Sequence, residues 1–114
     1  IAVHALGGGA NTLVGDGGIP GVTVKLKEDD EVVRDEGDVV VVELSAGAPS
    51  GRLVQLAREH GLLGLEWAAG IPGTVGGAVV MNAGAQGGCT AEWLTDVTVL
   101  DPRGSGEPFV LQAS

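Results

Sequence analysis

The 114-residue sequence is poor in the residues that build several common kinds of site. It has one cysteine, Cys89, so no internal disulfide can form, and no apolar run is long enough to span a bilayer. His4, His60 and Cys89 are its only soft metal ligands, and their spacing matches no zinc motif. We therefore expect no metal site, no membrane partner and a reducing, cytoplasmic setting.

Positive charge is also scarce. Six Lys and Arg residues stand against 15 Asp and Glu residues, for a formal net charge of -9. Such a balance repels a polyphosphate backbone, so nucleic acid is excluded as a partner. A small phosphorylated ligand remains possible, because main-chain N–H groups can hold phosphates with little help from Lys or Arg.

Glycine, by contrast, is abundant, with 21 residues that follow no collagen period and no Gly/Ser tract. Glycine is favoured where the backbone takes a positive φ or must come close to another group. Glycine loops beside apolar runs therefore suggest a ligand held by main chain.

Short β-branched runs between turn residues predict a strand-rich single domain. The predicted strands are residues 1–6, 12–14, 22–26, 32–33, 39–44, 94–100 and 109–112. The last two flank a turn at 101–104 and predict a hairpin. The charged stretch 28–38 is expected to be the solvated edge of another hairpin.

One long helix is predicted, starting at Ser50 as its cap and ended by Gly61. Its residues Leu53, Leu56, Ala57 and His60 share one face. A second, short buried helix is predicted between glycines from Thr74 onward, with its free N–H groups turned toward an anion.

The first glycine loop, at residues 7–11, resembles a dinucleotide fingerprint only in part. Thr12 stands where a third glycine or alanine is expected, and residues 16–20 replace the required helix. A Walker loop fails as well, because no Gly-Lys-Ser/Thr follows. Two interpretations stay open, an ordinary tight turn or an anion nest aided by Asn11.

Two segments, residues 5–14 and 64–85, resemble the flavin-binding signatures of the UDP-N-acetylenolpyruvoylglucosamine reductase family in sequence, order and separation. The resemblance implies an α+β fold: an FAD-binding subdomain with a mainly antiparallel or mixed sheet, one long helix and a short glycine-flanked helix. It also implies that residues 1–114 are a partial FAD-binding domain, without the domain's first part and without the substrate domain.

The same resemblance implies a set of FAD-binding residues and no catalytic residue. The pyrophosphate would face Gly7, Gly8, Gly9, Ala10 and Asn11. The ribityl chain and flavin ring would be held by Pro72, Gly73, Thr74, Gly76, Gly77, Asn82, Gly84 and Ala85. Gln86 and Cys89 depart from the tyrosine and glutamate that the family usually has there.

In that family NADPH reduces the flavin, and hydride then passes to the enolpyruvyl group of a UDP-amino sugar in peptidoglycan synthesis. The sequence thus implies FAD as cofactor, NADPH as reductant and a nucleotide-sugar substrate. The alternatives are a related flavoprotein oxidase and a truncated fragment without activity. The strand edges at 1–6 and 109–112 would favour self-association of such a fragment.

Overall fold

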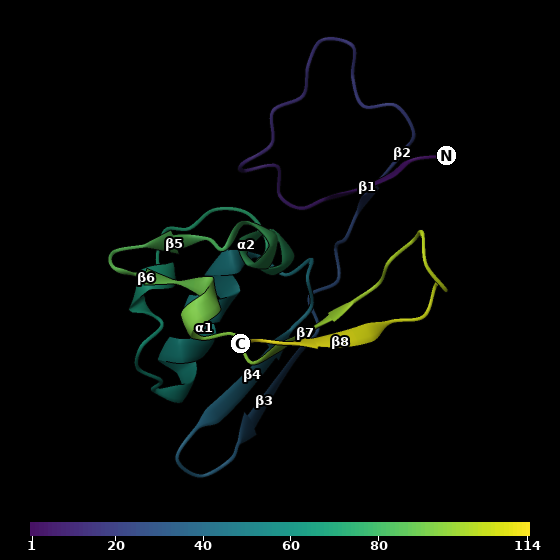
Figure 1. The fold of residues 1–114 in the computed structure, drawn as a ribbon. Helices are drawn as coiled ribbons and strands as arrows, with labels where there is room; N and C mark the ends of the chain where they lie inside the picture. The colour runs from purple at the N-terminus through teal and green to yellow at the C-terminus, as the bar shows by residue number, and fades with distance from the viewer.

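A computed structural model describes all of residues 1–114, which form four two-stranded sheets and a few short helices (Figure 1). The strands are β1 (Val3–Leu6), β2 (Val22–Lys25), β3 (Glu31–Asp35), β4 (Val40–Leu44), β5 (Gly84–Ala85), β6 (Gly88–Cys89), β7 (Asp96–Val99) and β8 (Phe109–Gln112). The helices are α1 (Ser50–His60), α2 (Val75–Met81) and the 3₁₀ turns η1 (Glu66–Ala68) and η2 (Thr90–Glu92). One sheet is parallel and three are antiparallel, which confirms the α+β prediction.

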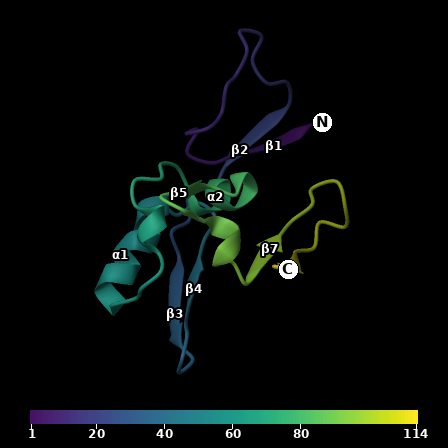
Figure 2. The same cartoon turned by 60° about the vertical axis from the view of Figure 1, so that its left-hand side comes forward.

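β1 and β2 form an arm that projects away from the rest of the molecule in both views (Figures 1 and 2). They pair in parallel, with Val3 opposite Val22, and residues 7–21 connect them without a helix. The missing crossover helix agrees with the rejection of a Rossmann unit. The predicted strand at 12–14 is wrong: these residues lie in the exposed connection, where no neighbouring strand offers a ladder, and Leu13 is 99% exposed.

The two long hairpins have the predicted pairing. β3 and β4 are antiparallel with Val33 opposite Val42, and β7 and β8 are antiparallel with Thr98 opposite Val110. The charged edge on β3 is more than a solvated face, however. Glu31 accepts hydrogen bonds from Arg52 on α1 at 2.6 and 2.5 Å, so this edge is tied to the helix.

Helix α1 begins differently from the prediction. Pro49 occupies the cap position and no side chain caps the helix, so the cap predicted at Ser50 is wrong. The Ser50 N–H donates to the Gly73 carbonyl, which draws the residue inward and leaves its Oγ buried without a partner. The other end is as predicted, because Gly61 closes the helix at φ 65°. His60 is exposed, whereas Leu56 and Ala57 are buried.

The core is small and lies where α1 and η1 meet, and η1 also contacts β5 and β6. Its apolar members are Ala48, Leu56, Ala57, Trp67 and Ala68. Trp67 packs directly on β6, since a Cβ on Gly88 would lie 2.7 Å from its Cγ. None of the helices has the length and apolar character needed to cross a membrane.

Candidate functional site

The two glycine loops, residues 7–11 and 70–77, meet face to face. A Cβ on Gly7 would lie 2.7 Å from Thr74 Oγ1, and one on Gly8 would lie 2.8 Å from Gly73 Cα. A larger residue at Gly8 would meet backbone and must push the loops apart, whereas one at Gly7 must first displace the Thr74 hydroxyl. Glycine here serves the approach of one backbone to another.

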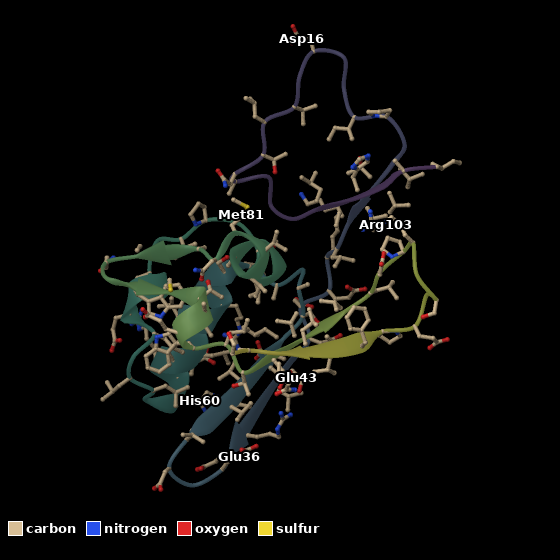
Figure 3. The ribbon with its side chains drawn as sticks, viewed as in Figure 1. Asp16, Glu36, Glu43, His60, Met81 and Arg103 are labelled. Atoms are coloured by element: carbon tan, nitrogen blue, oxygen red, sulfur yellow. The ribbon has the colours of Figure 1, made fainter.

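A hollow of about 100 Å³ opens between these loops and α2. Figure 3 shows Met81 on α2, on the side that faces the first loop. Eight of the predicted site residues line the hollow, together with four that the sequence did not indicate. The lining is Gly7, Gly9, Ala10, Asn11, Thr12, Pro72, Gly73, Thr74, Gly77, Ala78, Met81 and Ala83.

Unpaired backbone donors surround this hollow. The N–H groups of Gly8, Gly9, Ala10 and Asn11 donate no hydrogen bond within the chain, nor do those of Gly73 and Thr74. Gly9 has φ 76°, and successive N–H groups in such a turn can converge on one anion. Because no lining residue carries a charge, main-chain dipoles are the means by which this site can attract phosphate oxygens.

The start of α2 does not add donors, contrary to the prediction of free N–H groups there. Val75 and Gly76 donate to the carbonyls of Ala48 and Ala46, and Gly77 donates to Thr74 Oγ1 at 3.3 Å. The turn that precedes α1 therefore takes up the amides that a free helix end would offer. The available donors belong to the loops.

The other predicted residues lie outside the hollow or behind it. Gly76 packs on the turn at residues 46–49, since a Cβ at position 76 would lie 2.8 Å from the Cβ of Ala46. Asn82 ends α2 at φ 45°, and its Oδ1 accepts from the Ala91 N–H at 2.9 Å. Gly84 and Ala85 form β5. Gly8 contacts the second loop without lining the hollow.

Four residues that line the hollow were not predicted from the sequence, and for three of them the sequence contained an indication. Ala78 and Met81 follow Thr74 at helical spacing, so one face of α2 turns toward the hollow. Thr12 directly follows the first loop. Ala83 lies just beyond the end of the helix, where no spacing rule applies.

A larger hollow, of about 300 Å³, lies elsewhere, beside the start of α1 and β3. Its one cation is already paired, because Arg52 binds Glu31 through two nitrogens and Glu59 at 2.9 Å. The hydrogen bond from Arg52 lowers the pKa of Glu31 below its ordinary value of 4.5. The same contacts raise the pKa of Arg52. The smaller hollow differs, because the backbone donors around it have no partners.

His4 and Cys89 take structural positions. The His4 ring hydrogen-bonds the Pro20 carbonyl at 3.0 Å, across the mouth of the arm's connection, and does not line the hollow. The Cys89 side chain accepts from the backbone of Glu92 and caps η2. No group of three or more His, Cys, Asp and Glu side chains comes together as a metal site would need.

Comparison with known proteins places this chain in a family. A family model described as an FAD binding domain matches residues 1–107. The UDP-N-acetylenolpyruvoylglucosamine reductase of Prochlorococcus marinus (strain MIT 9313) is 52% identical over 108 residues, which cover 95% of this chain and 34% of the relative. That of Anaeromyxobacter dehalogenans is 45% identical over 106 residues, covering 93% and 32%.

A solved structure agrees with these matches. The UDP-N-acetylenolpyruvylglucosamine reductase (MurB) of Thermus caldophilus superposes with a TM-score of 0.76 at 35% identity, over 97% of this chain and 39% of that one. The chain thus spans about a third of the length of the curated relatives it matches. It belongs to the FAD-binding domain family, in the form that UDP-N-acetylenolpyruvoylglucosamine reductases contain.

Proposed function

We propose that this chain is the FAD-binding portion of an NADPH-dependent flavoenzyme of peptidoglycan synthesis. That enzyme reduces UDP-N-acetylglucosamine enolpyruvate to UDP-N-acetylmuramate in the cytoplasm. One observation carries the cofactor assignment: two glycine loops touch, and six of their backbone N–H groups have no partner, five of them on residues that line the hollow between the loops.

The residues present suit the diphosphate part of FAD. The N–H groups of residues 8–11 and of Gly73 and Thr74 would hold its oxygens. At about 100 Å³ the hollow is smaller than the roughly 300–1,000 Å³ of sites that enclose a whole ligand. We therefore assign it the diphosphate alone, with the rest of the cofactor outside the hollow.

Two side chains keep donors for the ribityl chain and the flavin ring. Thr74 Oγ1 accepts from Gly77 and its hydroxyl hydrogen is unused, while Asn82 uses only its oxygen, toward Ala91. The bond that Asn82 accepts holds its planar amide, so the NH₂ group has a fixed direction, whereas the Thr74 hydroxyl hydrogen can rotate toward an acceptor. Gly84 and Ala85 stay proposed contacts on β5.

When bound, the flavin supplies hydride chemistry, with NADPH as the proposed reductant and the enolpyruvyl UDP-sugar as the proposed acceptor. The role of these 114 residues is to bind and orient the cofactor. We assign no catalytic residue to them, and we expect no turnover from this chain alone.

The binding proposal is tested by titrating FAD, FMN and riboflavin into the purified chain and following flavin fluorescence. A site built for a diphosphate should bind FAD most tightly and riboflavin least, because only FAD carries the second phosphate. If all three flavins bound with equal affinity, the loops would not be binding the diphosphate. If none bound, the cofactor assignment itself would be wrong.

The reductase proposal needs a separate assay, of NADPH oxidation by the proposed parent enzyme. We expect oxidation that requires the enolpyruvyl UDP-sugar. Oxidation of a sugar or alcohol by oxygen, with formation of hydrogen peroxide and no need for NADPH, would instead identify a flavoprotein oxidase.

A further inference from the structure

A glycine outside the hollow occupies the junction between the arm and the rest of the molecule. Gly47 lies in the turn 46–49, between β4 and α1. A Cβ on Gly47 would lie 2.8 Å from three backbone atoms of the segment that follows β2: the Leu26 carbonyl carbon, the Lys27 nitrogen and the Glu28 oxygen. Its φ is not in the left-handed region, so the requirement is for space and not for conformation.

The same turn also holds the second glycine loop. The Ala46 and Ala48 carbonyls accept from Gly76 and Val75, each at 2.9 Å, and the Ser50 N–H donates to the Gly73 carbonyl at 3.0 Å. Ala48 is completely buried. The turn is thus bound on one side to the segment after β2 and on the other to the second loop.

The arm is consequently held at two places. At one end of its connection Gly7 and Gly8 touch Thr74 and Gly73, and after β2 the backbone of 26–28 rests on Gly47. A single contact would leave the arm free to swing about it. Two separated contacts fix its direction, and with it the spacing of the two loops.

We propose that Gly47 is a positioning residue for the cofactor site, which sets the first glycine loop against the second without itself lining the hollow. This inference rests on the proposed FAD-binding function. A methyl group at position 47 must displace backbone on one side or the other, because none of the three nearest atoms belongs to a movable side chain.

The first test compares Gly47→Ala with Gly51→Ala, whose Cβ meets nothing within 4 Å. We expect Gly47→Ala to weaken FAD binding by about tenfold or more, while Gly51→Ala binds like the parent chain. If the parent chain and both variants bound FAD with equal affinity, the inference would be overturned.

A rescue experiment covers the case in which Gly47→Ala does not fold. Gly76→Ala would place its Cβ 2.8 Å from Ala46 Cβ and so strain the other side of the same turn. Ala46→Gly removes that collision and leaves the longer contacts of 3.0 and 3.2 Å to the backbone of residue 46. We expect the double variant to recover part of the FAD affinity lost in Gly76→Ala, and no recovery would contradict a role for this turn.

A measurement without FAD separates the inference from the proposed function. Nitroxide labels at Thr23→Cys on β2 and Arg58→Cys on α1, in a Cys89→Ser background, report the arm-to-helix distance by pulsed EPR. Gly47→Ala should shift or broaden the distance distribution, and Gly51→Ala should not. An unchanged distribution overturns the inference. A shift in a chain that binds no FAD would keep the positioning role and remove the cofactor assignment.

Discussion

The three consecutive glycines of the first loop answer to different physical demands. Gly7 and Gly8 are required by the approach of the second loop, whereas Gly9 has open space around it and a φ of 76°. The pattern in the sequence predicts a glycine loop and leaves a tight turn and an anion nest equally open. Contacts with residues far away in the chain decide which glycine is needed for close approach and which for its positive φ.

Ser50 is another residue whose local pattern misleads. A serine before an apolar helical face predicts a cap, yet its hydroxyl is buried with no partner. A real cap would cost about 0.5–2 kcal/mol when replaced by alanine. Removal of an unpaired buried hydroxyl should instead leave stability unchanged or raise it.

We therefore expect Ser50→Ala to unfold at the same urea concentration as the parent chain or at a higher one. The backbone bond from residue 50 to Gly73 survives the change, so α1 should keep its place. A drop in stability of the size expected for a lost cap would show that the hydroxyl has a partner after all.

Glu31 gives the chain a predicted pH dependence. The hydrogen bond from Arg52 lowers its pKa below 4.5, so the folded state favours the carboxylate more than the unfolded state does. The stabilisation is thus present above the unfolded pKa and is lost as the pH falls through the folded pKa. The pair joins β3 to α1, and so the loss weakens that junction.

We expect Glu31→Gln to be less stable than the parent chain at neutral pH. The difference should shrink as the pH drops below about 4.5. Urea unfolding across an acid series measures it, with Glu107→Gln as the control because Glu107 forms no ion pair. A difference that stays constant or grows in acid would contradict the pairing.

At the scale of elements, the sequence predicts the positions of strands and helices better than the hydrogen bonds made at their ends. Strands β2, β4, β7 and β8 and helices α1 and α2 fall within a few residues of their predicted positions. The strand expected at 12–14 fails because a β-branched run needs a neighbouring strand to pair with. The free amides expected on α2 fail because the turn 46–49, distant in sequence, binds them.

Helix α1 offers a matched pair of glycine substitutions with opposite expected signs. Gly61 closes the helix at φ 65°, a conformation that costs an L-residue about 1–2 kcal/mol. Gly51 lies in the first turn with no positive φ and with nothing near its Cβ, so alanine there should gain about 0.5–1 kcal/mol.

Gly61→Ala should accordingly lower the urea midpoint, and Gly51→Ala should raise it. Thermal unfolding, followed by circular dichroism, should rank the stabilities of the two variants and the parent chain in the same order. If both variants moved in the same direction, glycine at position 61 would not be acting as a helix terminator.

At the scale of the whole molecule, little of the surface is removed from water. Six of 114 residues are buried, and β8 leaves Phe109, Val110 and Leu111 about half exposed. An apolar strand with a free edge is a template for pairing with another chain. The exposed edge supports the proposal that copies of this chain associate.

We expect the chain to sediment faster as its concentration rises, and Val110→Lys to reduce that dependence, because a charge on an edge strand opposes pairing. Leu63→Lys is the control: Leu63 is 84% exposed and lies outside the strands. Monomeric behaviour of the parent chain at all concentrations, or equal effects of both lysines, would exclude association through β8.

The candidate site could be predicted from the sequence only through a resemblance. Spacing and composition identify two glycine loops, and nothing local indicates that Gly8 meets Gly73 or that Met81 faces the space between them. Family likeness supplied the pairing of the loops. The geometry then divides the predicted residues into eight that line one hollow and five that lie beside or behind it.

The most direct test of this account is the FAD affinity of Gly8→Val beside that of Gly17→Val. Gly8 has the second loop 2.8 Å from its Cβ position, whereas Gly17 has nothing within 4 Å and no positive φ. If the meeting of the two loops makes the site, Gly8→Val should lose at least about tenfold in affinity while Gly17→Val binds FAD like the parent chain. Equal affinities for the two variants would contradict it.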